Sequence, residues 1–275
     1  MKLAGLGPDP THRSTQLDIR LGVTVEALEW GRFGVRAIAA DGRVFQADQA
    51  VITLPLGVLK AKRVRFIPEL PPEKLEAIER LGVAEAVKLF YHFDHPVFPP
   101  GINELYVPGA NPDEWWSSSR GHGVPIEILT SLATGPKARE LLRMPPEQAL
   151  RAGLETLRQA LGRPDLTPSK ALLAHWQDDP FALGAYSKAS VGASTARATL
   201  AKPVAHRLFF AGEHTAANAW AATVHGAYAS GRRAAREILA ARALPTAGSS
   251  SPGTHPSAEF TPPRAPDRAF SLKHG

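Results

Sequence analysis

The fold is decided by residues 208–215, LFFAGEHT, together with residues 222–231, ATVHGAYASG. The first stretch is an apolar run of β-forming residues that stops at Gly212 and Glu213. After a short loop, a helix of small residues is predicted to start at Thr223. This order places a carboxylate at the end of a buried strand, beside the N–H groups and partial positive charge of a helix N-terminus. The pattern favours the floor of a binding site in which the carboxylate accepts hydrogen bonds from sugar hydroxyls.

The composition indicates a soluble globular protein. The 275 residues suffice for one large domain or two smaller ones, and a hydrophobic fraction of 44% can form a core. The net charge of +6 is spread along the chain, and pairs such as Arg232-Arg233 fit a solvated helix face better than a nucleic-acid stripe. No apolar run approaches the roughly 20 residues that cross a bilayer. We therefore expect a cytoplasmic protein without a nucleic-acid or membrane partner, and without a signal peptide.

The absence of cysteine excludes several kinds of chemistry. With no Cys in the sequence, disulfides, thiolate metal sites, a cysteine nucleophile and a flavin tethered through sulfur are ruled out. His214 and His225 lie eleven positions apart and have no further ligand at metal-binding spacing. We therefore expect no metal site.

Alternating and helical patterns predict a mixture of strands and helices. Over Val83–Phe93 the alternation predicts a strand with Val87 and Leu89 on one face and Lys88 and Phe90 on the other. The other predicted strands are 18–28, 33–40, 44–54, 126–133, one within 171–190, and 207–211. Within 44–54, the apolar run 51–54 suits a strand buried on both faces. The predicted helices are 73–81, one that opens at 145–146 and ends at 162, and 223–239. Residues 94–125 are predicted to form a long loop.

Four segments, taken in order, resemble the flavin-containing amine oxidases, which include monoamine oxidases, polyamine oxidases and the lysine-specific histone demethylases. Any one of these segments is a weak signal, and their common order is a strong one. The segments are 17–25 (LDIRLGVTV), 51–59 (VITLPLGVL) continuing through 66–71 to 81–88 (LGVAEAVK), 176–187 (WQDDPFALGAYS), and the stretch quoted first.

The resemblance implies an α/β fold built of two parts. Residues 17–60 and 200–242 would form the remainder of a Rossmann-like FAD-binding domain, and 61–199 an α+β substrate domain. Residues 1–16 are expected to be poorly ordered and 243–275 to form a disordered tail. Family members open with a βαβ unit bearing G-x-G-x-x-G, whereas this chain has only Gly5 and Gly7, followed by Pro8. Three alternatives remain open: the missing half is another polypeptide, the gene is truncated, or FAD chemistry has been lost.

The resemblance assigns catalytic roles to two residues. Lys88 matches the family lysine that holds a water molecule against flavin N5, and Tyr186 matches an aromatic wall beside the substrate amine. The alternative for Lys88 is an ordinary strand lysine that faces solvent. With Leu81 and Gly82 at the family spacing upstream of it, we favour the catalytic role.

The resemblance also assigns cofactor contacts. Gly212 and Glu213 match the turn and the acid beside the ribityl and pyrophosphate groups, with an exposed loop carboxylate as the alternative. Ala185 stands where monoamine oxidases carry the flavin-linking cysteine, so FAD would be bound non-covalently. The remaining matched positions, each with an ordinary structural alternative, are Val25 and Pro55 (plain strand residues), Trp176 (a core aromatic, as for Phe181), and Thr223 and Val224 (an ordinary helix N-cap).

The implied reaction is oxidation of a small-molecule amine: hydride transfer to flavin N5, hydrolysis of the imine, and reduction of oxygen to hydrogen peroxide. Two other functions stay open. The chain could be a non-catalytic remnant, or a subunit that needs a dinucleotide-binding half on another chain. It could instead be a flavoprotein that acts on a non-amine hydrocarbon.

Overall fold

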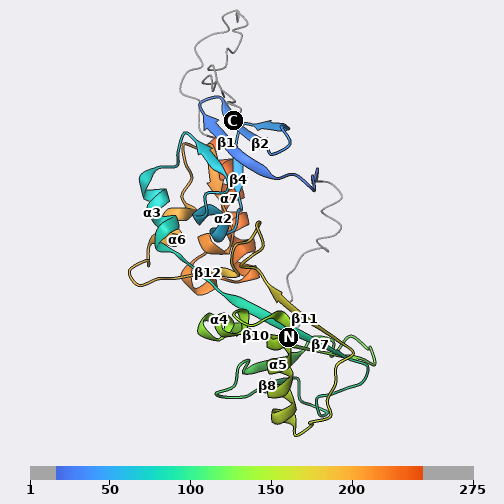
Figure 1. The fold of residues 1–275 in the computed structure, drawn as a ribbon. Coiled ribbons are helices and arrows are strands. Elements are labelled where there is room, and N and C mark those ends of the chain that lie inside the picture. The colour runs from blue at the N-terminus through green and yellow to red at the C-terminus, as the bar shows by residue number, and fades with distance from the viewer. Residues whose placement is uncertain (1–16, 244–275) are drawn as a thin grey trace, which may run out of the picture.

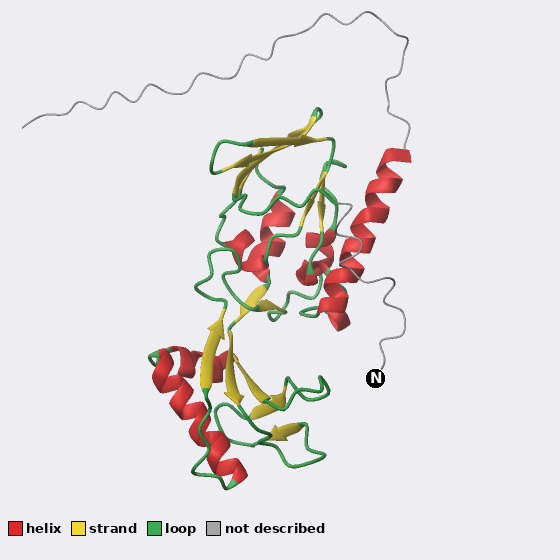
Figure 2. Cartoon of the chain, turned by 90° about the vertical axis from the view of Figure 1, so that its right-hand side faces the viewer, coloured by secondary structure: helices red, strands yellow, loops and turns green. Residues whose placement is uncertain are grey.

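The computed structural model describes residues 17–243, which form an elongated molecule of two lobes (Figures 1 and 2). The expectations for residues 1–16 and 244–275 lie outside the described residues. The larger lobe holds both ends of the described chain, and the smaller lobe is formed by residues of the middle of the chain (Figure 1). The larger lobe is therefore built from two separate parts of the sequence, and the smaller lobe from one continuous part.

The smaller lobe is built on a five-stranded antiparallel sheet in the order β11-β7-β10-β9-β8. Helices α4 (Gly135–Leu142) and α5 (Pro146–Leu161) pack on one side of this sheet (Figure 2). The strands are β7 (Ala86–Phe93), β8 (Glu104–Tyr106), β9 (Glu114–Ser117), β10 (Glu127–Thr134) and β11 (Lys170–His175).

Strand β7 confirms the predicted alternation. Val87, Leu89, Tyr91 and Phe93 are fully buried in the core cluster that includes residues of α4 and α5. Lys88, Phe90 and His92, which alternate with them, are only partly buried. Because side chains of a strand alternate between its two faces, the partly buried set lies on the sheet face away from these helices.

The larger lobe combines three small sheets with four helices. Strands β1 (Val25–Gly31), β2 (Gly34–Ala39), β3 (Val44–Ala47) and β5 (Arg65–Ile67) form one sheet in the order β3-β2-β1-β5. Strand β13 (Leu208–Phe210) runs parallel to β4 (Ala50–Ile52), and β12 (Tyr186–Lys188) is antiparallel to β6 (Gly82–Ala84). The helices are α2 (Leu56–Lys60), α3 (Pro72–Arg80), α6 (Ala196–Ala201) and α7 (Val224–Ala243).

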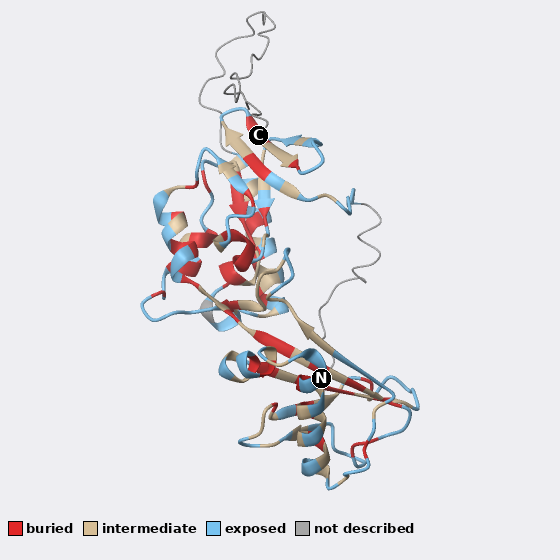
Figure 3. Ribbon diagram, viewed as in Figure 1, coloured by how far each residue is buried: buried red, intermediate tan, exposed pale blue. Residues whose placement is uncertain are grey.

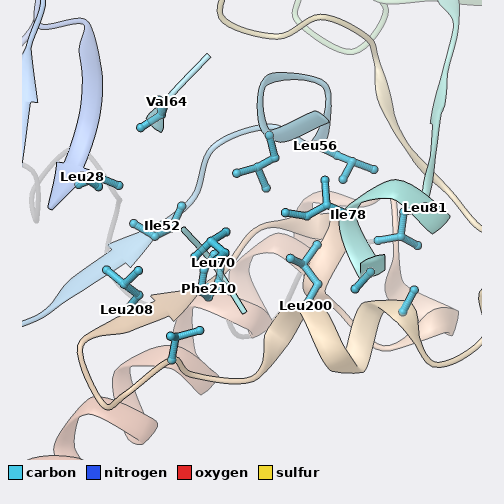
Figure 4. Close-up of a cluster of buried hydrophobic side chains, with 14 of the residues drawn as sticks. Leu28, Ile52, Leu56, Val64, Leu70, Ile78, Leu81, Leu200, Leu208 and Phe210 are labelled. Atoms are coloured by element: carbon cyan, nitrogen blue, oxygen red, sulfur yellow. The ribbon is translucent and has the colours of Figure 1, made fainter. Parts of the chain in front are cut away.

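The core of the larger lobe lies between these sheets and helices. Ile52 of β4, together with Leu208 and Phe210 of β13, packs against residues from β1, α3 and α6 (Figure 4). Figure 3 shows the same concentration of buried residues around α2, α3 and α6. The apolar run that precedes Gly212 is therefore the centre of this lobe, as its composition predicts.

Several predicted strands were wrong in extent. The strand expected over 18–28 begins only at Val25, and the one expected over 44–54 is two strands, β3 and β4, that belong to different sheets. The chain leaves the first sheet at Asp48-Gln49 to reach the second. Val51 is 44% exposed, so the expectation of a strand buried on both faces was also wrong.

The strand predicted over 83–93 is divided at Glu85. Its first part, β6, pairs with β12 in the larger lobe, and its second part, β7, enters the sheet of the smaller lobe. This segment thus carries the chain from one lobe to the other. Helix 73–81 and strands 126–133 and 207–211 are confirmed to within one or two residues at each end, whereas β8 and β9 lie in the predicted loop 94–125.

Lys74 ties helix α3 to the C-terminal end of α6. Its ammonium is buried, donates to the carbonyls of Thr199 (3.1 Å), Leu200 (2.8 Å) and Lys202, and lies 4.1 Å from the centre of the Phe210 ring. A cation suits this place because the last carbonyls of a helix have no partner within the helix and carry partial negative charge.

Titration of Lys74 is expected to make the stability depend on pH. Burial, with a smaller contribution from the charge of Arg233, lowers the pKa of Lys74 from 10.5 to about 7. Between these values the unfolded chain binds the proton and the folded protein releases it, so the free energy of unfolding should rise with pH. Urea denaturation at pH 7, 8 and 9 should show this rise in the wild type and in Lys62→Met, which removes an exposed lysine. The rise should be reduced in Lys74→Met, and equal slopes in all three proteins would contradict the expectation.

Candidate functional site

A small cavity of about 210 Å³ lies where three distant segments of the larger lobe meet beside Val83 of β6. The first segment runs from the end of β4 into α2, the second is the loop that leads into β12, and the third follows β13. The lining residues are Thr53, Pro55, Leu56, Gly57, Val83, Ala182, Gly184, Ala185, Tyr186, Gly212, Glu213 and His214. Four residues that the sequence predicts for the site, namely Pro55, Tyr186, Gly212 and Glu213, are therefore brought together.

The first two segments touch at Gly57. A Cβ atom added at Gly57 would lie 2.2 Å from the carbonyl oxygen of Leu183 and 2.6 Å from that of Ala182. Only a residue without a side chain allows α2 to approach the loop this closely. The same loop holds Leu183 at a φ of 53°, which is an unfavourable conformation for a leucine. This wall of the cavity is therefore a tight and strained contact between backbones.

Glu213 joins the other two segments. It lies in a short 3₁₀ helix (Glu213–Thr215) directly after β13. Its Oε1 accepts a hydrogen bond from the backbone N–H of Ser187 (2.8 Å). Its Oε2 accepts one from the hydroxyl of Ser187 (2.6 Å) and one from the backbone N–H of Ala222 (2.8 Å). The carboxylate thus holds β12 and the residues that precede α7 in fixed positions around the cavity.

His214 contributes a buried imidazole to the same wall. Its side chain is only 3% exposed, and its Nε2 has no hydrogen-bond partner among the described residues. Burial lowers the pKa of His214 to about 4; the Glu213 carboxylate opposes this shift and Arg197 adds to it. The ring is therefore neutral at physiological pH, with a polar atom left without a protein partner.

The start of α7 lies beside Glu213 and is capped by Thr223. The Thr223 hydroxyl accepts from the N–H of Gly226 (3.1 Å) and donates to the carbonyl of Trp220 (2.6 Å). The ordinary N-cap role considered for Thr223 is thus present, and it is compatible with a ligand at the free N–H groups of the first turn. Val224, the first residue of the helix, is 88% exposed.

Small residues allow α7 to pack closely on β13. Gly226, Ser230 and Ala234 form the buried stripe of the helix. The hydroxyl of Ser230 accepts from the N–H of Gly212 (2.8 Å), which has a φ of 121° that favours glycine. The small residues of the sequence are therefore explained by this packing, which fixes the turn that carries Glu213.

Lys88 lies on the open face of the sheet in the smaller lobe. Its ammonium is 5.6 Å from the centre of the Trp116 ring. Tyr186 pairs with Ala84, which is four residues before Lys88, so at most about 14 Å of chain separates Lys88 from the residue opposite Tyr186. Lys88 thus lies on the strand that continues from β6 at the cavity wall, but in the sheet of the smaller lobe.

The other predicted residues, Trp176 and Val25, lie in other parts of the fold. Trp176 follows the end of β11, is partly buried, and accepts a hydrogen bond at its carbonyl from Gly184 N–H (3.0 Å), which closes the loop before β12. Phe181 in this loop is 64% exposed, so the core position considered for it was wrong. Val25 lies at the start of β1 and lines a separate, more open hollow of about 670 Å³ together with Arg20 and Phe45.

Three residues around the cavity were missed by the sequence reasoning. Gly57 was given no role within segment 51–59, although a glycine after an apolar strand also signals close backbone approach. Ser187 and Arg197 carried no local signal, because their partner Glu213 lies 26 and 16 positions further along the chain. Within residues 17–243 no cluster of three or more His, Asp or Glu side chains could hold a metal, and no helix is long and apolar enough to cross a membrane.

The chain belongs to the flavin-containing amine oxidoreductases. The model of the family described as "Flavin containing amine oxidoreductase" matches residues 8–239. Membership in this family implies a flavin cofactor and agrees with the resemblance carried by the four sequence segments.

Two relatives show which members the chain is similar to. It is 38% identical to Polyamine oxidase 4 of Oryza sativa subsp. japonica over 238 residues, which are 83% of this chain and 47% of that protein. It is also 38% identical to Lysine-specific histone demethylase 1 homolog 2 of the same organism over 224 residues, which are 78% of this chain and 29% of that protein. The chain therefore spans about half the length of the first relative and under a third of the second.

A solved structure confirms the fold class. Wild-type putrescine oxidase bound to putrescine superposes with a TM-score of 0.75 at 19% sequence identity, over 83% of this chain and 51% of that one. The expected mixed α/β architecture of the amine oxidase type is thus present in the described residues.

Replacement of Gly57 should test the tight wall of the cavity. In Gly57→Ala the new methyl group overlaps the carbonyl of Leu183, so the free energy of unfolding should fall by about 1–3 kcal/mol. Gly31→Ala is the matched control because its Cβ would meet no atom within 4 Å. It should change stability by less than about 0.5 kcal/mol. Urea denaturation measures both, and equal effects would show that the contact at Gly57 is not as close as described.

Proposed function

We propose that the chain is the catalytic part of an FAD-dependent amine oxidase in which the cavity between β12 and the end of β13 holds the cofactor non-covalently. The observation that carries this proposal is the meeting of Pro55, Tyr186 and Glu213 around one cavity, since these residues come from three separate segments. Family membership supports the flavin, and the similarity to polyamine and putrescine oxidases supports a small aliphatic amine as substrate.

The residues around the cavity fit a flavin. The wall is formed mainly by small residues and backbone, which can lie flat against an aromatic ring. The unpartnered Nε2 of His214 offers a hydrogen-bonding atom that no protein group satisfies. The sequence contains no cysteine and carries Ala185 in the lining, which supports a cofactor held without a covalent bond.

Glu213 has less capacity for the ligand than the sequence suggests. A carboxylate offers about four lone-pair positions, and three are taken by Ser187 and Ala222. The position that remains is on Oε1, so Glu213 would accept one hydroxyl of the ribityl chain. Its larger role would be to fix the residues that surround the ring.

The other residues would orient the reactants. When bound, FAD supplies the acceptor for the two electrons of the amine. The N–H groups at the start of α7 would stabilise negative charge on the ring edge that faces them. Lys88 would hold a water molecule near the reacting atoms, and the Tyr186 ring would form one wall that excludes water from the substrate amine.

The length of the chain bears on the alternatives. Because it spans about half of the relatives it matches, a subunit that needs a separate dinucleotide-binding half and a non-catalytic remnant remain competing functions. A flavoprotein with a non-amine substrate is a third. The relatives favour an amine over this third function.

Flavin binding and turnover test the proposal directly. The purified 275-residue protein should retain FAD after gel filtration, show the absorbance of bound oxidised flavin, and produce hydrogen peroxide with putrescine or spermidine. Glu213→Gln should weaken FAD binding about tenfold or more, because the amide group presents a donor to the N–H and O–H donors around it. Glu104→Gln, at an exposed carboxylate in the other lobe, is the control and should bind FAD as the wild type does.

Two results would contradict the proposal. A colourless protein that does not bind FAD at saturating concentration would favour the remnant or the subunit. If the protein retains flavin but forms no peroxide with any amine, the proposed reaction is rejected. If Glu213→Gln also binds FAD as the wild type does, the assigned site is rejected as well.

A further inference from the structure

Arg197 is a buried arginine that bonds to the cavity through a serine. It is the second residue of α6 and is only 5% exposed. Its Nη1 donates to the hydroxyl oxygen of Ser187, and its Nη2 donates to the carbonyl oxygen of the same residue (3.3 Å). The guanidinium therefore holds Ser187 at two points in a forked arrangement.

Ser187 passes this orientation on to Glu213. A hydroxyl has one proton, and because the Ser187 oxygen accepts from Arg197, that proton is free to point at Glu213 Oε2 (2.6 Å). The backbone N–H of Ser187 donates to the other carboxylate oxygen (2.8 Å). Hydrogen bonds in such a chain strengthen one another, so the bonds from Arg197 strengthen those that Ser187 donates to the Glu213 carboxylate.

Arg197 is poorly explained by packing or by a direct ion pair. Its Nη1 is 3.9 Å from Glu213 Oε2, beyond hydrogen-bond distance. Burial lowers the pKa of Arg197, and the Glu213 carboxylate only partly opposes the shift. A buried charge is expensive unless it is well paired, and a leucine or methionine would fill a similar volume. Unlike a leucine or methionine, Arg197 donates two hydrogen bonds to Ser187.

The network reaches the cavity from two sides. From α6, Arg197 fixes Ser187 and through it Glu213. From α7, Arg233 donates to the hydroxyl of Thr215 (3.2 Å), at the other end of the same short turn, and to the carbonyl of Phe210 (2.5 Å), at the end of β13. The turn Glu213–Thr215 is thus held between two arginines, of which only Arg197 acts on the carboxylate.

We propose that Arg197 is a positioning residue for the Glu213 carboxylate, acting through Ser187 to hold the cofactor cavity in its binding geometry. This inference rests on the proposed function for its effect on FAD, and on the contacts alone for its effect on Glu213. The guanidinium itself does not touch the bound molecule.

Variants at both residues separate the charge of Arg197 from its forked hydrogen bonds. Arg197→Lys keeps the charge but loses the fork, Arg197→Met loses both, and Ser187→Ala removes the link. Arg158→Met is the matched control, because Arg158 also donates to a backbone carbonyl (Leu166, 2.9 Å), but in the smaller lobe. FAD affinity is measured by fluorescence titration, and unfolding by urea without cofactor for the single variants and the Arg197→Met/Ser187→Ala pair.

Positioning predicts a specific pattern. Arg197→Lys and Arg197→Met should both weaken FAD binding about tenfold, and Ser187→Ala should do the same without an additive effect in the pair. Arg158→Met should keep the wild-type affinity. The imidazole pKa of His214, followed by NMR without cofactor, should rise in Arg197→Met and change little in Arg197→Lys, because Arg197 lowers it through its charge.

The outcomes distinguish this inference from the proposed function. If the wild type does not bind FAD, the proposed function fails, and the unfolding cycle then decides the inference: non-additive effects of Arg197→Met and Ser187→Ala support it, and additive effects overturn it. If the wild type binds FAD and Arg197→Lys binds it equally well, the positioning role is wrong whatever its effect on stability.

Discussion

The hydrogen bonds of the Glu213 carboxylate are the interaction on which the rest of the site depends. They join β12 and the residues before α7 to the end of β13, across 26 and 9 positions of sequence. A carboxylate that is largely removed from water is destabilising unless donors surround it. The donors come from two separate segments, β12 and the residues before α7, so the hydrogen bonds to Glu213 fix both segments at the cavity.

The connection between the lobes places the rest of the site. The chain crosses into the smaller lobe through β6 and β7 and returns through β11 and β12, and these strands pair with each other in the same order on both sides. The paired strands form one ribbon that carries Tyr186 at the cavity and Lys88 on the open sheet face. A substrate that reached both residues would lie along this ribbon, between the cavity and the face of the sheet away from α4 and α5.

The sequence predicted the elements whose signal is local. The alternation in β7 predicted a strand with one buried face, and the apolar run before Gly212-Glu213 predicted a buried strand; both strands are observed in the fold. The division of 44–54 into two strands was missed, because Val44-Phe45 and Ala50–Ile52 are both β-forming and only tertiary pairing assigns them to different sheets. Ser187 and Arg197 could not be found, since a hydroxyl and a guanidinium acquire their roles only when folding brings Glu213 to them.

Hydrogen–deuterium exchange with and without saturating FAD tests whether the cofactor occupies this cavity, because it reports where the cofactor acts on the chain rather than whether activity is present. We expect slower exchange on FAD binding in two segments, residues 182–186 and 212–215, because both contribute residues that line the cavity. Unchanged exchange in both segments, in a protein that does bind FAD, would place the cofactor elsewhere and contradict the account.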